Sequence, residues 1–287
     1  MKKVLLVLFS IIYMMSSCNV TPKSNDTGEK ANDTLNIVSF AQNFKIYPLE
    51  TGYKLVIKYS SSESEYYLFS DTDSIPSYLT DKAIIRTPVK SAVAFSSTQW
   101  SVFQKLGEIG RVKGILESNY TKNEEILALV ANGSITDVGL STNVNTEKLI
   151  HLQPDLILYT PYPGIDFSHL GELSGATMLS FPDYLESHPL GRAEWMRLYG
   201  RLVGKGHVAD SIFAIIEAEY KSLKSLTDSP ELVSRPTVLF DTMVGSAWYV
   251  PGGRSTMAQL VSDAGGRYLF ADNVKSGSVP LAFETVL

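Results

Sequence analysis

ITDVGLSTNVNTEKLIHLQPDLIL, residues 135–158, is the stretch that decides the fold. It contains a short apolar run, a segment with helix start and stop residues, and a second apolar run. Thr146 can cap the N-terminus of the helix, and Glu147 suits its positive end. The helix ends before Pro154, because proline disfavours a helical residue in front of it. Asp155 then leads into a continuous apolar strand, and this order predicts a parallel sheet with helices on its faces.

The same alternation continues on both sides of this stretch. Strands are predicted at residues 93–95, 135–139, 156–159 and 177–181, and helices at residues 98–106, 123–131, 146–152 and 168–174. Together they form a predicted N-terminal α/β lobe over residues 89–206. Sheets of this type bind ligands beyond the carboxyl ends of their strands.

A long helix and a second lobe are predicted after residue 206. Apolar side chains recur with helical spacing from Val208 to Leu226, which predicts a connecting helix over residues 207–227. A strand near residue 238 and a helix with Ser255 as its N-cap indicate a C-terminal α/β lobe over residues 228–287. Because that lobe stops within a helical pattern at Leu287, we expect it to be incomplete and the chain to be truncated there.

The residues before the first lobe have a different pattern. Residues 35–88 alternate in short apolar and polar pieces separated by turn residues, which predicts an antiparallel β extension. The predicted fold class is therefore α/β, with two doubly wound lobes joined by a single long helix and a small N-terminal β extension.

The N-terminus has the features of an export signal. Lys2 and Lys3 precede an apolar run from Val4 to Met15, which is too short to span a bilayer comfortably. The run leads to Cys18, the only cysteine, after small residues that resemble a bacterial lipobox. We expect a signal peptide at residues 1–17, a lipidated flexible tether at residues 18–34, and an extracytoplasmic, membrane-anchored protein. The alternative is a chance cysteine in an ordinary secretory signal.

Composition and motifs argue against several classes of function. Without Lys2 and Lys3 the chain keeps 23 of its 25 basic residues against 30 acidic ones, and no basic stripe indicates a nucleic-acid partner. The four histidines form no HxxxH or HxH pair, so neither a resident metal nor a cofactor is expected. In the segment Gly200–Gly206, three residues separate Gly200 from Gly204, whereas a phosphate loop has four residues between its glycines. No nucleophile elbow is present in the sequence. We therefore expect no catalytic residues, and a lipoprotein enzyme on the same scaffold remains the alternative.

Four blocks resemble one protein family. The stretch quoted above resembles a block of the substrate-binding proteins of ABC importers for iron-siderophores, haem and cobalamin. Three more blocks occur in the family's order: Ala94–Thr98 before a helix ending in Leu106-Gly107, Tyr249–Ser255 with Gly265-Gly266, and Ser278–Leu287. The resemblance covers about residues 89–287.

The resemblance implies a function and its partners. The protein would capture a ferric chelate, haem or cobalamin outside the cytoplasm and deliver it, as a monomer, to an ABC permease and its ATPase. By resemblance, Glu147 and Glu284 would be the two surface glutamates, one per lobe, that dock onto the permease. The alternative within this family is a truncated binder that does not transport.

Candidate cleft residues follow the predicted strands. Aromatic rings offer apolar area with a polar edge, which suits a macrocycle or a chelate. The alternative for each aromatic residue is packing in the core. The candidates are Ser96, Ser97, Thr98, Tyr159, Thr160, Tyr162, Phe181, Asp183, Tyr184, Met243, Ser246, Trp248, Tyr249 and Arg254.

Overall fold

The computed structural model describes residues 35–227 and 234–286. The predicted signal peptide, the predicted lipidation site Cys18 and the predicted tether lie outside these residues. Within them, the predicted α/β fold class is confirmed. None of the helices in the described ranges is both long and apolar enough to cross a membrane.

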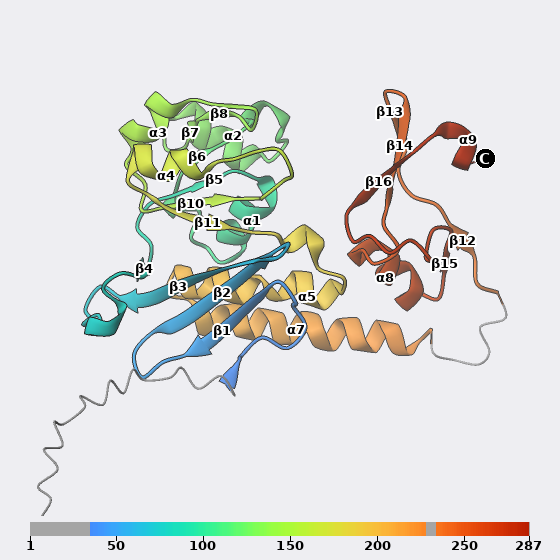
Figure 1. Ribbon diagram of the computed structural model, residues 1–287, viewed down its shortest axis with the longest axis horizontal. Helices are drawn as coiled ribbons and strands as arrows, with labels where there is room; N and C mark the ends of the chain where they lie inside the picture. The colour runs from blue at the N-terminus through green and yellow to red at the C-terminus, as the bar shows by residue number, and fades with distance from the viewer. Residues whose placement is uncertain (1–34, 228–233, 287) are drawn as a thin grey trace, which may run out of the picture. The chain divides into compact units, whose positions relative to one another are not determined.

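The largest sheet of the described residues is a five-stranded parallel sheet, which we call the central sheet (Figure 1). Its strands, in spatial order, are β11 (Thr177–Ser180), β10 (Leu156–Tyr159), β5 (Ala92–Ala94), β6 (Val112–Ile115) and β7 (Thr136–Asp137). The chain runs from β5 outward to β7 and then returns to β10 on the other side of β5. The direction of winding therefore reverses between β5 and β10, where the loops after these two strands diverge. Such a switch point is where doubly wound sheets bind ligands.

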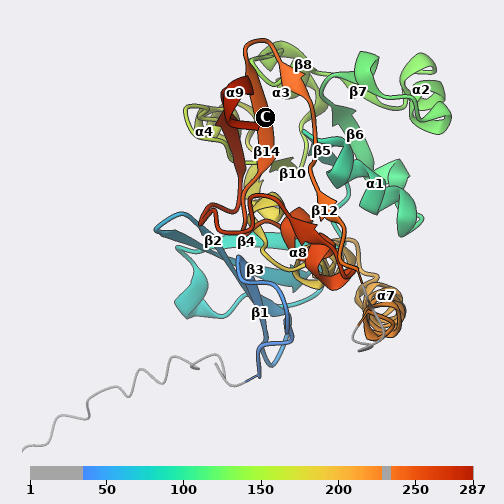
Figure 2. The same ribbon diagram turned by 90° about the vertical axis from the view of Figure 1, so that its right-hand side faces the viewer.

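Helices cover both faces of this sheet. They are α1 (Ser97–Lys105), α2 (Glu124–Ala131), α3 (Thr146–Leu152) and α4 (Ser168–Ser174). Figure 2 shows α1 and α2 on one side of the central strands and α3 and α4 on the other. Alternate residues of β10 point to opposite faces, so Leu156 and Leu158 join one core cluster and Ile157 joins another.

The caps of α3 differ from the sequence prediction. The N-cap is Asn145, whose side chain accepts a hydrogen bond from the Lys148 backbone N–H, so the prediction of Thr146 as the cap was wrong. Asn145 has an extended backbone that leaves its side chain free to turn back on the helix, whereas Thr146 is already helical. The helix ends at Leu152, as predicted, with Gln153 in the left-handed region.

Three helices follow the central sheet: α5 (Pro189–Glu194), α6 (Met196–Leu202) and α7 (Gly206–Ser225). The helix α7 covers most of residues 207–227, which were predicted to be helical. Gly200 allows α6 to lie close to α7, because a Cβ at this position would collide with the side chain of Ala209.

The N-terminal β extension is a four-stranded sheet. It contains β1 (Phe44–Pro48), β2 (Tyr53–Tyr59), β3 (Ser62–Ser70) and β4 (Ala83–Thr87), of which only β3 and β4 pair in parallel. One face of this sheet belongs to the same hydrophobic core as α6 and the central strands; Phe44, for example, lies 4.4 Å from Trp195 between ring centroids. The extension is thus an integral part of the core.

Two buried glutamates fasten the chain that enters β1. Glu186 and Glu194 have no exposed surface, and we call them the glutamate pair. Glu194 accepts backbone hydrogen bonds from residues 39, 40 and 41 at 2.7–3.0 Å, and Glu186 accepts those of residues 42 and 43 at 2.8 and 3.0 Å. Glu186 also accepts a hydrogen bond from Trp195 Nε1 at 3.0 Å. Burial raises the pKa of Glu186, and these donors oppose the shift.

The C-terminal segment has two small sheets. The strands β12 (Thr237–Val238) and β15 (Arg267–Tyr268) pair in parallel, and the second sheet has the order β13 (Met243–Val244), β14 (Ala247–Pro251) and β16 (Ser278–Leu281). The helix α8 (Thr256–Asp263) has Ser255 as its N-cap, as predicted, and α9 (Phe283–Val286) follows β16. Thr256 at the start of α8 donates a hydrogen bond to the Glu186 carbonyl oxygen at 2.5 Å.

The substitution Glu186→Gln tests the glutamate pair. The amide puts an N–H₂ group against a backbone N–H or the Trp195 indole N–H, which leaves a buried donor unsatisfied. We expect the free energy of unfolding to fall by about 2 kcal/mol, measured by urea denaturation followed by circular dichroism. The exposed Glu172 of α4 provides the matched control, Glu172→Gln, which we expect to be neutral. Equal stability of the two variants would contradict the assigned role.

Candidate functional site

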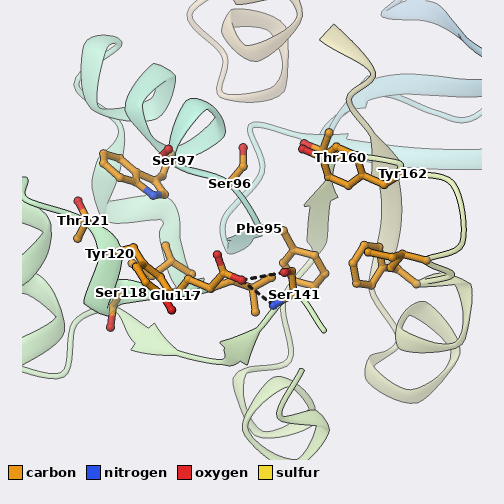
Figure 3. Close-up of a pocket in the computed structure, with 15 residues that line it drawn as sticks. Phe95, Ser96, Ser97, Glu117, Ser118, Tyr120, Thr121, Ser141, Thr160 and Tyr162 are labelled. Carbon is orange, nitrogen blue, oxygen red and sulfur yellow. Dashed lines mark hydrogen bonds between the residues drawn. The ribbon is translucent and has the colours of Figure 1, made fainter. Parts of the chain in front are cut away.

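A pocket lies where the central sheet reverses its winding. It has a volume of about 270 Å³ and opens beyond the carboxyl ends of β5, β6 and β10 (Figure 3). The loop after β5 and the start of α1 contribute Phe95, Ser96, Ser97 and Trp100; the end of β6 and the turn after it contribute Ile115, Leu116, Glu117, Ser118, Tyr120 and Thr121; Ser141, Thr160, Tyr162, Ile165 and Phe167 complete the wall. This is the position that the parallel sheet predicts for a ligand.

The first turn of α1 forms one side of the pocket. Ser96 is its N-cap, and a capping box joins Ser96 to Gln99. The buried Gln99 side chain also donates to the Thr160 hydroxyl at 3.4 Å, across the switch point. The loops after β5 and β10 are therefore connected directly, and the backbone N–H groups of the first helical turn lie beside the hollow.

The turn after β6 forms the opposite side. Glu117 has a left-handed backbone, with φ of 58° and ψ of 42°, which is uncommon for a residue with a side chain. Its carboxylate accepts hydrogen bonds from the backbone N–H and hydroxyl of Ser141, at 3.0 and 2.7 Å. Ser141 lies in the turn between β8 (Gly139–Leu140) and β9 (Asn143–Val144). Figure 3 shows this contact at the edge of the pocket.

The carboxylate of Asp137 also supports the turn after β6. Asp137, at the end of β7, accepts hydrogen bonds from the Ser118 backbone N–H at 2.9 Å, from the Ser118 hydroxyl, and from the Gly139 N–H at 2.7 Å. Burial alone would raise the pKa of Asp137, but these donors outweigh it and hold the pKa below its usual value. The carboxylates of Glu117 and Asp137 therefore both accept hydrogen bonds from other residues of the protein.

Aromatic side chains form the wall after β10. Tyr162 is 48% exposed and lines the pocket, and its ring lies 5.3 Å from the Tyr184 ring between centroids. Tyr184 donates a hydrogen bond to the Pro161 carbonyl oxygen at 3.0 Å, which holds this loop. Burial raises the pKa of Tyr162, and the charge of Asp183 adds to the effect. Tyr162 is therefore a neutral phenol at physiological pH.

The structure brings four of the predicted cleft residues together in this pocket: Ser96, Ser97, Thr160 and Tyr162. Tyr159 and Tyr184 lie behind its aromatic wall, with the Tyr159 ring 5.8 Å from Phe167 between centroids. Three others, Thr98, Phe181 and Asp183, line a different hollow of about 460 Å³ bounded by α1, α5, α6, α7 and α8.

The five C-terminal candidates do not line either hollow: Met243, Ser246, Trp248, Tyr249 and Arg254. Trp248 donates from Nε1 to the Phe240 carbonyl oxygen at 3.0 Å and stacks on Phe283 at 6.5 Å between centroids. Met243, Ser246, Tyr249 and Arg254 are exposed. Their contact with a ligand stays a prediction.

Several pocket residues escaped the sequence analysis. Glu117, Ser118, Tyr120 and Thr121 follow β6, a strand that was not predicted because Lys113 and Gly114 interrupt its apolar run. The pattern Val-Lys-Gly-Ile-Leu at residues 112–116 was the available signal, since it lies one helix length after the strand at residue 93. Ser141 lies in a tight turn that sequence periodicity does not mark.

The two predicted docking glutamates are exposed. Glu147 lies in the first turn of α3 and Glu284 in that of α9, where a negative charge suits the helix dipole. In residues 35–227 and 234–286, no group of three or more His, Cys, Asp or Glu side chains is arranged to hold a metal ion.

The substitution Asp137→Asn tests the support beneath the pocket. A lowered pKa in the folded state contributes stability above the unfolded pKa, and this stability is lost as the pH falls through the folded value. We expect the variant to be less stable than the parent by about 1–2 kcal/mol at pH 7, with the difference shrinking below about pH 4. Urea unfolding from pH 7 to pH 3 measures this, and Asp81→Asn, at an exposed turn, is the control. A difference that is independent of pH would contradict the assignment.

The chain is similar to known proteins in sequence and in fold. An uncharacterised lipoprotein of Methanocaldococcus jannaschii, MJ0878, is 28% identical over 278 residues, which cover 87% of this chain and 65% of the relative. The Fe³⁺-hydroxamate transport system protein of Saccharomonospora viridis has 22% identity and a TM-score of 0.54, covering 69% of this chain and 70% of that one. The catecholate-siderophore binding protein VctP of Vibrio cholerae has 13% identity and a TM-score of 0.55, covering 81% and 74%.

The match to a family rests on the sequence itself. The chain spans about two thirds, or 65%, of the length of MJ0878 and 51% of that of a second M. jannaschii protein, MJ0642. The family model described as periplasmic binding protein matches residues 93–287, more than half of the chain. The chain therefore belongs to the periplasmic binding protein family.

Proposed function

We propose that this protein is the extracytoplasmic substrate-binding component of an ABC importer. In this role it captures a ferric chelate, haem or cobalamin and delivers the ligand to a membrane permease. The observation that carries the proposal is the pocket at the switch point of the central sheet. Family membership supports binding without turnover as its task.

The lining of the pocket favours a ligand with flat or apolar faces. Of its lining residues only Glu117 is charged, and Ser141 already engages that carboxylate. The remaining polar side-chain groups are hydroxyls and the Trp100 indole N–H, and Tyr120 and Tyr162 are 78% and 48% exposed. Rings and hydroxyls recognise macrocycles and chelates by stacking and hydrogen bonding. Solved proteins of the same fold include haem-binding and vitamin B12-binding proteins.

A lipid anchor at Cys18 fits this role. The relative MJ0878 is named as a lipoprotein. An anchored receptor stays near the membrane, which raises its effective concentration at a permease. The exposed Glu147 and Glu284 would then fix its orientation, because charged contacts steer docking more than they add affinity.

Titration of the purified protein tests ligand capture. Trp100 lines the pocket, so haemin, ferric desferrioxamine or cyanocobalamin should quench tryptophan fluorescence on binding. We expect at least one of the three to bind, and Tyr162→Ala to weaken it about tenfold, or about 1.4 kcal/mol, because a ring face is lost. Tyr78→Ala, an exposed tyrosine outside the pocket, is the matched control. Failure of all three probes to bind would overturn the proposal.

Charge reversal tests the docking glutamates. We expect Glu147→Lys and Glu284→Lys to leave the affinity for the ligand unchanged, because both side chains are exposed and outside the pocket. Uptake of the ligand by cells carrying either variant should fall at least tenfold, since repulsion replaces attraction at the permease. Glu172→Lys, an equally exposed charge on α4, should transport normally. Normal uptake by the double variant would remove these residues from the interface.

A further inference from the structure

The charge of the ligand pocket comes from a single acid. Glu117 is the one charged side chain among the residues that line the pocket, and none of these residues is a Lys, Arg or His. Lys122, which follows the lining residue Thr121, is exposed and does not line the pocket. The loop after β10 carries a further exposed acid, Asp166, next to the lining residue Phe167. The lining therefore carries one negative charge and no positive one.

The described part of the protein does not neutralise this charge. The backbone N–H and the hydroxyl of Ser141 both donate to Oε1 of Glu117, and both donors are uncharged. Figure 3 shows dashed lines from only one oxygen of this carboxylate. In residues 35–227 and 234–286 no base forms an ion pair with Glu117. Glu108, by contrast, has Arg111 and Lys205 at 2.5 and 2.9 Å.

The Glu117 carboxylate is held in place at the pocket. The Glu117 backbone N–H donates to the Gly139 carbonyl oxygen at 2.9 Å, so the backbone and the side chain of Glu117 are both bonded to the β8–β9 hairpin. The left-handed backbone of Glu117 does not itself call for an acid, because glycine adopts this conformation without strain. A glutamine would accept the same two hydrogen bonds from Ser141. The local structure therefore needs an acceptor here, but it does not need the charge.

The first turn of α1 opposes the charge of Glu117 only in part. The N-terminus of a helix carries a partial positive charge of about half an elementary charge. The Ser96 side chain already accepts the Gln99 backbone N–H of this turn. The full negative charge of Glu117 is larger than the partial charge that remains. The pocket is therefore more favourable for an uncharged or positive ligand than for a negative one.

We propose that Glu117 is a specificity-determining residue that excludes anionic ligands, so that the pocket takes an uncharged or cationic chelate or macrocycle. The inference rests on the proposed function in so far as the pocket takes a ligand, and it narrows the class of that ligand. An anion in this pocket loses part of its hydration and meets a fixed carboxylate, with no basic side chain in the lining to compensate. An uncharged ligand can still stack on the rings and form hydrogen bonds with the hydroxyls.

Pairs of ligands that differ in charge test the inference. The pairs are haemin dimethyl ester and haemin, ferric N-acetyl- and N-succinyl-desferrioxamine B, and cyanocobalamin and its monocarboxylic acid. The second member of each pair is the more anionic. Quenching of tryptophan fluorescence gives both Kd values for each pair that binds. We expect the more anionic member to bind about tenfold more weakly or worse, and the ratio to shrink at high ionic strength, because salt screens the repulsion.

Glu117→Gln removes the charge and keeps an acceptor for Ser141. The ratio of the two Kd values should fall to less than twofold, and this ratio is insensitive to a structural change that affects both members of a pair alike. Glu172→Gln is the matched control, since it removes an exposed charge on α4 outside the pocket and should keep the tenfold ratio. The control separates the effect of Glu117 from that of the net charge of the chain.

The outcomes separate this inference from the proposed function. A parent protein that binds a pair with equal affinity for both members, or that prefers the anionic member, contradicts the role of Glu117 and leaves the proposed function standing. An unchanged ratio in Glu117→Gln, or an equal loss of the ratio in Glu172→Gln, also contradicts that role alone. If the parent binds none of the six compounds, the proposed function fails and this inference fails with it.

Discussion

The glutamate pair is the constraint on which the rest of the structure depends. Five consecutive backbone N–H groups, residues 39–43, approach β1 without a neighbouring strand to pair with, and Glu186 and Glu194 accept all of them. Buried N–H groups without acceptors cost on the order of 1–3 kcal/mol each. Because Glu194 ends α5 and Glu186 precedes it, this one contact joins the N-terminal sheet to the helices behind the central sheet. Arg197 balances part of the charge, with its guanidinium 3.1 Å from Glu194 Oε1.

The glutamate pair also fixes the packing of aromatic side chains between the N-terminal sheet and the central sheet. Trp195, which donates to Glu186, packs against Phe44 of β1 and Phe181 after β11, at 4.4 and 5.3 Å between ring centroids. The N-terminal sheet is therefore held at one position relative to β11, and Tyr66 of β3 donates a hydrogen bond to the Met178 carbonyl oxygen of β11 at 3.1 Å. A β segment outside the family match is thus fixed to the sheet that carries the pocket.

Local sequence patterns predicted much of the fold but few of the contacts between residues that are far apart in the sequence. The apolar runs at Val93 and Leu156 predicted the parallel sheet, and the helical spacing from Val208 to Leu226 predicted the long helix. Ser255 was predicted as the N-cap of α8. These predictions were possible because period and cap chemistry are local properties. The strand β6 was missed, since its four residues include Lys113 and Gly114. The glutamate pair could not be predicted, because its partners lie 143–155 residues away in sequence and any solvated glutamate has the same local pattern. The predicted topology placed candidate residues in the loops that follow the predicted strands. This included Ser96 and Tyr162 but not Glu117, because the strand before Glu117 was not predicted.

The groups of the pocket that can contact a ligand are those that are not already hydrogen-bonded within the protein. Asp137, which supports the turn after β6, and Glu117, which lines the pocket, accept hydrogen bonds from Ser118, Gly139 and Ser141. Withdrawing either one for a ligand would expose a buried donor and release the left-handed turn at Glu117. Recognition is then left to ring faces and hydroxyls, which select by shape and hydrogen-bond geometry more than by charge. A pocket built this way is ordered before the ligand arrives, and its selectivity depends on how firmly the aromatic wall is held.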